Sequence, residues 1–80
     1  MPALYLTEQG SSLRLDGQRL IVEKDDEVLW SVPAVPVERV MMCGHVQATT
    51  PAVGFLLKKR IDVSFLSMHG RLKGRLVSPE

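Results

Sequence analysis

The chain has 80 residues, of which 45% are hydrophobic and 24% charged, and its formal net charge is +1. This composition excludes a disordered or collagen-like chain and predicts one small globular domain. No apolar run approaches the roughly 18 to 20 residues that cross a bilayer, so we expect no membrane span. No secretory leader follows Met1, which predicts a cytoplasmic location. Because Cys43 is the single cysteine, an intrachain disulfide and a multi-cysteine metal site are excluded.

Alternation of polar and apolar side chains predicts antiparallel strands in the first half of the chain. Residues 11–15 and 18–23 both alternate with a period of two, as half-buried strands do. Between them lies an Asp-Gly dipeptide at 16–17, which is typical of a two-residue hairpin turn. A second turn at 24–26 leads into residues 28–32, where every second side chain is again apolar. These segments together predict an antiparallel meander.

One later segment changes to a helical period. Thr50 is a favourable N-cap, and Pro51 suits the first helical position because that position needs no amide donor. The apolar residues that then share one face are Val53, Leu56 and Leu57. We therefore expect a short helix over residues 50–59. Gly54 weakens such a helix by about 1 kcal/mol relative to alanine, so its expected use is a close approach of the helix to a sheet.

Strand patterns return on both sides of this helix. Residues 37–42 follow a proline-containing connector at 33–36. Residues 61–66 and 71–77 are joined by a hairpin loop at 67–70. The expected fold class is therefore mainly β with one short helix, in a single small domain.

The small size of the chain predicts a partner surface. The core of a domain of about 70 to 80 residues rarely supplies more than about 3 to 5 kcal/mol of stability without outside help. The sequence also stops directly after its last strand-like segment, without a closing helix or a polar tail. We expect it to be a fragment of a longer protein.

Candidate catalytic and metal-binding side chains are few: Cys43, His45, His69 and scattered carboxylates. Cys43 and His45 flank one glycine, a spacing that suggests a thiolate beside an imidazole or two ligands of a metal site. That spacing gives no reason for a third and a fourth ligand to approach, so a small buried thiol beside a surface histidine is the simpler interpretation. The contiguous carboxylates at 25–27 lack the alternating spacing of a calcium loop and are typical of a solvated turn.

Basic residues concentrate towards the end of the sequence, since residues 1–57 carry a formal charge of −3 and residues 58–80 carry +4. The candidates for phosphate contact are Lys58, Lys59, Arg71, Lys73 and Arg75. Alternation predicts that the last three project from one face of a strand, while the two lysines lie at the C-terminal end of the helix, where cations are favourable. One interpretation is salt-dependent contact with a nucleic-acid backbone. The other is a solvated charged face that protects a sheet edge from pairing.

A stacking platform for single-stranded nucleic acid requires several exposed rings on one face. The chain has one Trp, one Tyr and two Phe, and alternation directs Trp30 and Phe65 inward. We therefore expect no such platform.

The order of several short segments is more specific than any single residue. These segments are LYLTEQGSSLRLDG near the start, VERV in the middle strand, TTPA at the helix start, and IDVSFLS followed by GRLKGRL at the end. Together they resemble the N-terminal β-domain of the CRISPR-associated endonuclease/integrase of the spacer-acquisition, or adaptation, complex. The resemblance covers essentially the whole chain.

This resemblance implies a small β-sandwich-like domain of antiparallel sheets with one short helix over residues 1–80. In the family this domain is followed by a larger helical domain, which is absent from this sequence. The full-length family members are metal-dependent DNA endonucleases and integrases that use magnesium or manganese. Their metal ligands lie in the helical domain, so the resemblance implies no catalytic residue, no metal ligand and no cofactor within this chain, which we expect to be inactive alone.

The resemblance also implies partners: a second copy in a homodimer, double-stranded DNA and a small adaptation partner subunit. In some relatives an aromatic residue near the first turn braces the end of the duplex, whereas this chain carries Gln9 before Gly10. Gln9 cannot stack as a ring does, but a hydrogen bond to DNA remains open to it. Relatives often carry glycine where Arg60 follows the helix, which predicts strain in a left-handed cap here.

Two alternatives stay open at this point. One is a free-standing β-rich protein-interaction module without a DNA role. The other is a small metalloenzyme built on Cys43 and His45.

Overall fold

The computed structural model describes residues 2–78, which form strands and one helix. In chain order the elements are β1 (Ala3–Leu6), β2 (Ser12–Asp16), β3 (Arg19–Lys24), β4 (Glu27–Pro33), β5 (Arg39–Cys43), β6 (Gln47–Ala48), α1 (Thr50–Lys58), β7 (Asp62–Leu66) and β8 (Leu72–Leu76).

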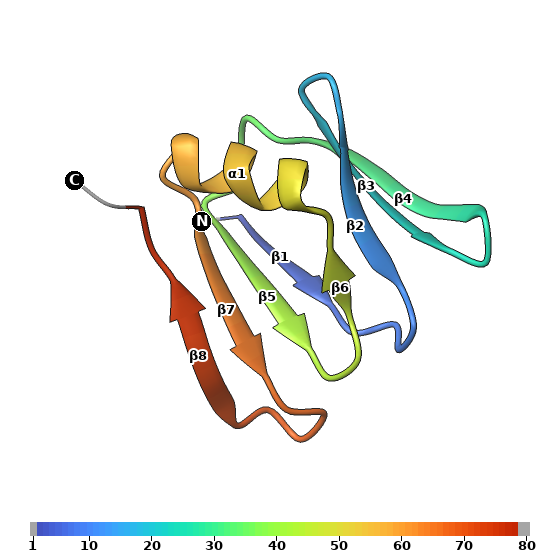
Figure 1. The fold of residues 1–80 in the computed structure, drawn as a ribbon, viewed down its shortest axis with the longest axis vertical. Helices are drawn as coiled ribbons and strands as arrows, with labels where there is room; N and C mark the ends of the chain where they lie inside the picture. The colour runs from blue at the N-terminus through green and yellow to red at the C-terminus, as the bar shows by residue number, and fades with distance from the viewer. Residues whose placement is uncertain (1, 79–80) are drawn as a thin grey trace.

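The strands form two four-stranded sheets. Sheet A has the order β1-β5-β7-β8, and sheet B has the order β4-β3-β2-β6. Figure 1 shows sheet A at the left and centre, with α1 above its strands and the β3–β4 hairpin projecting to the right. The predicted class, mainly β with one short helix, is confirmed.

Both sheets are mixed, which corrects the prediction of antiparallel sheets. β5 runs parallel to β1 and to β7, and β6 runs parallel to β2. Parallel neighbours need a connection that leaves the sheet at the end of one strand and returns to its opposite end, where the next strand begins. The segment containing β6 and α1 forms this crossover between β5 and β7. The hairpins β2–β3, β3–β4 and β7–β8 are antiparallel, as the alternation predicted.

The meander of sheet B depends on two turns that contain residues in the left-handed backbone conformation, with positive φ. The first turn is formed by residues 17–18, one position later than predicted, and Gly17 supplies a φ of 62°. In the second turn Asp25 and Asp26 have φ values of 53° and 63°, the combination of a type I′ turn. Aspartate tolerates this conformation better than most residues, so these carboxylates have a structural reason to be there.

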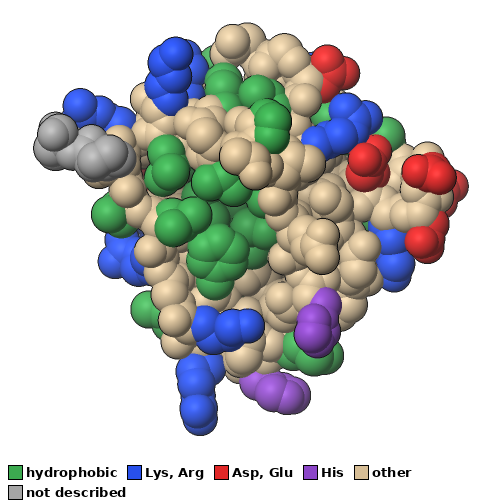
Figure 2. All heavy atoms as spheres, in the orientation of Figure 1, with side chains coloured by type: hydrophobic (Ala, Val, Ile, Leu, Met, Phe, Trp, Pro, Cys, Tyr) green, Lys and Arg blue, Asp and Glu red, His purple; other side chains and the backbone are tan. Residues whose placement is uncertain are grey.

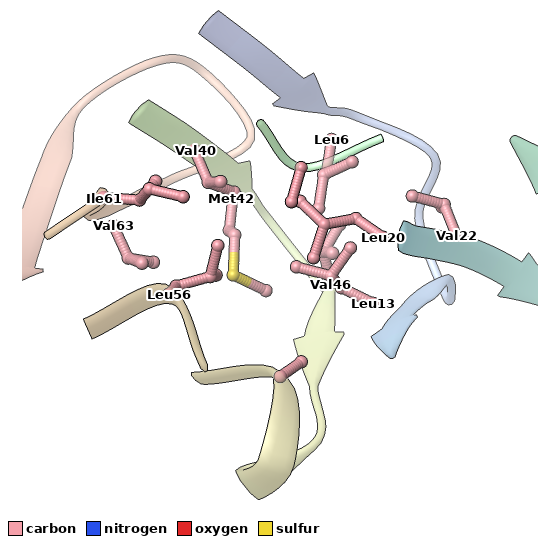
Figure 3. Packing of buried hydrophobic residues seen from close by; sticks show 12 residues of the cluster. Leu6, Leu13, Leu20, Val22, Val40, Met42, Val46, Leu56, Ile61 and Val63 are labelled. Atoms are coloured by element: carbon pink, nitrogen blue, oxygen red, sulfur yellow. The ribbon is translucent and has the colours of Figure 1, made fainter. Parts of the chain in front are cut away.

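The hydrophobic core lies between the two sheets and α1. Its buried members are Leu6, Leu13, Leu20, Val22, Ala34, Val40, Met42, Val46, Ala52, Leu56, Ile61 and Val63. Figure 3 shows Met42 of sheet A beside Leu56 of the helix, and Val46 and Leu13 on the side of Met42 that faces away from Leu56. The crossover therefore supplies side chains that join the two sheets into one core.

The two aromatic residues predicted to point inward differ in burial. Phe65 is half-buried against the core. Trp30 pairs with Val22 and so lies on the core side of sheet B, but 46% of its surface is exposed. The reason is the projection of the β3–β4 hairpin away from sheet A (Figure 1). The prediction was right about the face of the sheet and wrong about burial of the indole.

The N-cap of the helix lies one residue earlier than predicted, at Thr49 rather than Thr50. The Thr49 hydroxyl accepts a hydrogen bond from the amide of Ala52 at 3.2 Å. The Thr49 amide donates to the carbonyl of Leu13 at 3.0 Å, so the β6 ladder leads directly into the cap. Gly54 is exposed, and a Cβ atom there would meet nothing within 4 Å, so the predicted close approach to a sheet is wrong.

The helix ends in a Schellman motif. Arg60 has the left-handed φ of 61° expected at this position, and its amide donates to the carbonyl of Leu57 at 3.0 Å. The amide of Ile61 donates to the carbonyl of Leu56 at 2.8 Å. Leu56 and Ile61 are both buried in the core, which is the apolar contact that accompanies this motif.

Gln9 connects the β1–β2 loop to the β5–β6 loop. Its Nε2 donates to the carbonyls of Thr7 at 3.0 Å and Cys43 at 2.9 Å. Its Oε1 accepts a hydrogen bond from the amide of His45 at 2.7 Å. The amide of Gly10 also donates to the carbonyl of His45 at 2.7 Å. The side chain of Gln9 therefore replaces backbone pairing where the two loops diverge.

Gly44 provides the space for this connection. Its φ is 76°, in the region that favours glycine. A Cβ atom at Gly44 would collide with the amide oxygen of Gln9 and would lie 2.8 Å from Cγ of Met68. The loop needs glycine here for both its backbone angle and its lack of a side chain.

No helix formed by residues 2–78 has the length and apolar character needed to cross a membrane.

Arg60→Gly is expected to give a more stable chain than Arg60→Ala, by about 1 kcal/mol, because glycine adopts a left-handed φ without steric cost. Both variants remove the arginine side chain, so their comparison isolates the backbone preference. Urea unfolding monitored by Trp30 fluorescence measures the difference. Equal unfolding free energies for the two variants would contradict the strained cap.

Gly44→Ala is expected to lower the free energy of unfolding by more than about 2 kcal/mol, because φ strain and the collision with Gln9 add together. Gly70→Ala is the matched control, since Gly70 has a φ of 87° but a Cβ there meets nothing within 4 Å. It should cost only about 1 kcal/mol. A double-mutant cycle with Gln9→Gly, measured by urea unfolding, should show that the cost of Gly44→Ala falls when Gln9 is absent. Additive costs would disprove the collision.

Candidate nucleic-acid interface

The helix-end lysines are exposed and have a local structural role. Lys58 is the last helical residue and Lys59 is the C-cap, so both charges lie where they complement the helix dipole. The Lys59 Nζ lies 5.7 Å from the centre of the Phe55 ring, a cation–π contact. Contact of either lysine with DNA stays a prediction.

The common stripe of Arg71, Lys73 and Arg75 stays a prediction, because Arg71 precedes β8 and the pairing of β8 is irregular near Lys73. The β7–β8 pairing shifts register between Phe65 and Leu66. Arg75 pairs in register with Ser64 and lies in a hollow on the outer face of sheet A. Lys73 lines a different hollow, and Arg71 precedes β8 in the hairpin loop.

The basic residues are also divided between the two ends of sheet A. The lysines of α1 precede the start of β7, whereas Arg71 follows its end. The five residues of β7 span about 13 Å at roughly 3.3 Å per residue. The lysines of α1 and Arg71 therefore lie near opposite ends of β7.

Gln9 is half-buried, and its side chain is already engaged in the three hydrogen bonds that connect the loops. Both amide hydrogens are donated, so a further hydrogen bond to DNA would have to displace one of these contacts or use the remaining lone pair of Oε1. The DNA contact of Gln9 stays a prediction, and the hydrogen bonds give its side chain a structural role in connecting the loops.

A group that sequence reasoning did not bring together lies between the β5–β6 and β7–β8 loops. A hollow of about 260 Å³ is lined by Gly44, His45, Ser67, Met68, His69 and Lys73. Both histidines are exposed, as their positions in loops predicted. Their proximity follows from the parallel pairing of β5 and β7, whose C-terminal ends lie at the same edge of sheet A. Only a prediction of that pairing would have revealed the site.

The outer face of sheet A contains a second hollow, of about 440 Å³. It is lined by Arg39, Met41, Asp62, Ser64, Leu66, Leu72 and Arg75. Arg75 forms an ion pair with Asp62 at 3.4 Å. Tyr5 pairs in register with Met41, so it borders this surface, and 57% of its own surface is exposed. We call these eight residues the sheet A face.

The opposite outer surface, on sheet B, differs in composition. Arg14 forms an ion pair with Glu23 at 3.0 Å. Arg19 donates from Nε to the hydroxyl of Ser31 at 3.0 Å. These polar groups interact with one another, as expected for a sheet face in contact with water. The sheet A face exposes apolar side chains from four strands, whereas the apolar exposure of sheet B is confined to β4, at Val28, Leu29 and Trp30.

Within residues 2–78, no three side chains of His, Cys, Asp or Glu converge on one position where they could hold a metal ion. Cys43 is half-buried rather than fully buried, and His45 is exposed beside it. The described part of the chain therefore does not fit a magnesium or manganese site, and it gives no support to a metalloenzyme built on Cys43 and His45. Asp25 and Asp26 belong to a turn, as predicted.

Comparison with known proteins gives a consistent match. Residues 4–80 match the family described as CRISPR associated protein Cas1. The chain is 41% identical over 71 residues to the CRISPR-associated endonuclease Cas1 1 of Thermus thermophilus, covering 89% of this chain and 22% of that protein. It is 30% identical over 70 residues to the CRISPR-associated endonuclease Cas1 1 of Archaeoglobus fulgidus, covering 88% of this chain and 20% of the relative. The chain thus spans about a fifth of the length of these curated relatives.

The fold agrees with this match. A chain of a solved structure described as a partial Cas6-RT-Cas1–Cas2 complex superposes with a TM-score of 0.88 and 29% identity. The superposition covers 99% of this chain and 24% of that chain. Since the family match extends over nearly every residue and the same fold recurs in a Cas1-containing assembly, the chain belongs to the CRISPR associated protein Cas1 family.

Proposed function

We propose that this chain is the N-terminal β-domain of a CRISPR adaptation integrase, in which it mediates homodimerisation and helps to position duplex DNA. The relatives are described as endonucleases, and a similar solved structure is a complex with Cas2. The observation that supports an assembly role best is the sheet A face. The comparisons give no support to a free-standing interaction module.

The composition of the sheet A face favours a protein partner. Tyr5 and Leu72 are 57% and 56% exposed. Tyr5 pairs in register with Met41, and Leu72 pairs with Leu66, so the two apolar pairs lie in different rows of the same sheet face. Contiguous apolar side chains on a sheet surface are costly in water and mark interaction sites. Covering this face would add a second apolar layer to a domain whose own core is small.

The charges on the same face favour a second copy as that partner. A two-fold interface is formed by one surface meeting itself, so the surface must carry both signs of charge. The sheet A face carries Arg39 and Arg75 together with Asp62. Two such faces about a two-fold axis can place Arg39 of one copy opposite Asp62 of the other, with the apolar residues between them.

The integrase chemistry is proposed to lie outside this region. A metal-dependent step would need a cluster of carboxylate and histidine ligands, and residues 2–78 do not bring one together. The relatives are roughly five times as long as the matched region, which leaves room for a separate domain that binds magnesium or manganese. A small adaptation subunit of the Cas2 kind and a cytoplasmic location complete the proposal.

Leu72→Glu is expected to dissociate the dimer, raising its Kd at least about tenfold, because the carboxylate would lose water in an apolar interface. Val35→Glu is the matched control, since Val35 is 86% exposed and lies outside the sheet A face. Light scattering over a concentration series measures the oligomeric state. A wild-type chain that stays monomeric at high concentration, or equal effects of the two variants, would remove the sheet A face from the proposal.

Duplex DNA binding by the chain is expected to be weak and to decrease with salt. Lys73→Gln should reduce the slope of log K against log salt by about 0.9, because one phosphate contact and its counterion release are lost. Arg75→Gln should leave this slope unchanged, since Arg75 belongs to the sheet A face and pairs with Asp62. Fluorescence anisotropy with a labelled duplex measures both. A larger change of slope for Arg75 than for Lys73 would reverse the assignment of these two residues.

A further inference from the structure

The hollow between the β5–β6 and β7–β8 loops has a distinct charge character. The residues that line it include the cationic Lys73 and the imidazoles of His45 and His69. No carboxylate is among the lining residues. Figure 2 shows both histidines, in purple, at the lower edge of the molecule near a blue side chain, while the red carboxylates visible on this face gather at the right and upper edges. The hollow is therefore suited to an anion.

The backbone around the two histidines is held by hydrogen bonds. On the β5–β6 side, the amide of His45 donates to Gln9 and the amide of Gly44 donates to the carbonyl of Leu66 at 2.8 Å. On the β7–β8 side, the hydroxyl of Ser67 accepts from the amides of His69 at 3.3 Å and Arg71 at 3.1 Å. The two loops thus present both imidazoles from fixed backbones, which reduces the entropy lost when a ligand binds.

Neighbouring charges do not neutralise this hollow. Arg71 lies in the same hairpin loop as His69, and Lys73 follows it on β8. The β1–β2 loop, which contacts the backbone of His45, carries Glu8, but Glu8 pairs with Lys24 of β3 at 3.3 Å. His45 also borders a third hollow, between the β1–β2 and β5–β6 loops. Its other lining residues are all uncharged: Gly10, Ser11, Ser12, Gly44, Val46 and Gln47. Among residues 2–78, the groups that line the two hollows beside these histidines are cationic or neutral, so a bound anion is the natural source of compensation.

We propose that this hollow binds a phosphate of the nucleic-acid backbone, and that His45 and His69 take up protons when it binds. The proposal rests on the DNA-positioning role and adds a site and a dependence on pH to it. Histidine changes its charge between about pH 5 and pH 8, and a phosphate contact favours the charged form. DNA affinity should consequently increase as the pH falls through this range.

The size of the effect follows from counterion release. Each additional cation that contacts a phosphate steepens the slope of log K against log salt by about 0.9. If both histidines are protonated in the complex, the slope at about pH 5.5 should be steeper by nearly 2 than at about pH 8. At moderate salt the affinity should increase about tenfold or more over the same interval.

The test compares the 80-residue chain with the variant His45→Gln/His69→Gln, which keeps polar side chains but cannot take up protons. Anisotropy titrations with a labelled duplex at several salt concentrations, at about pH 8 and about pH 5.5, give the four slopes. The wild-type slope should steepen at low pH, and the variant slope should not. Urea unfolding at both pH values verifies that the variant stays folded. Arg19→Gln, which removes a cation from the outer face of sheet B, should keep the pH dependence of the wild type.

The outcomes separate this site from the DNA-positioning role. A salt-dependent affinity that does not change with pH, or a pH dependence that survives in the double variant, would overturn the histidine site and leave DNA positioning intact. The absence of binding at low salt and at either pH would refute both. Titration with inorganic phosphate, followed by NMR of the imidazole rings, distinguishes the ligand sources. Saturation by free phosphate without competition between it and the duplex would also overturn the assignment to the DNA backbone.

Discussion

The parallel pairing of β5 with β7 is the constraint on which the other features of this domain depend. Two adjacent parallel strands cannot be joined by a tight turn, so the chain must leave sheet A after Cys43 and return at Asp62. On the way it adds β6 to sheet B and forms α1, whose buried residues Ala52 and Leu56 complete the core between the sheets. The same pairing places the ends of β5 and β7 at one edge. The loops that follow them, and with them the two histidines, are neighbours for this reason.

The loops at this edge are held by hydrogen bonds from a side chain to the backbone rather than by continuous backbone ladders. Gln9 supplies three side-chain hydrogen bonds where strands β1 and β5 separate, and Gly44 leaves the space that the Gln9 amide occupies. A residue that the family resemblance connects with the DNA end thus acts in this chain on the backbone of its own loops. Through its hydrogen bond to the amide of His45, Gln9 also fixes the backbone position of that histidine.

The two outer faces of the sandwich suit different roles, one in contact with water and the other in a dimer interface. The face of sheet B carries ion pairs and hydrogen bonds that stay within one chain and are compatible with water. The sheet A face exposes Tyr5 and Leu72 around a mixed set of charges, which suits a self-complementary contact. Because the histidine hollow lies at the loop edge of the same sheet, two-fold assembly through the sheet A face would carry two such hollows in a symmetric pair. This gives the proposed dimer and the proposed phosphate site one structural basis.

Local sequence patterns were sufficient to predict those features whose cause is local. Period-two alternation predicted the hairpins, the threonine-proline pair and the apolar spacing predicted the helix within one residue, and the ordered segments identified the family. Tertiary structure decided the rest, because its causes are contacts between residues far apart in the chain. No local pattern distinguishes a strand with parallel neighbours from one in a hairpin, so the mixed sheets and the histidine hollow were not foreseen. The register shift between β7 and β8 depends on the pairing of the two strands, and the alternation of Lys73 and Arg75 alone did not predict it. The exposure of Trp30 likewise depends on how far the opposite sheet extends, which the sequence of β4 does not contain.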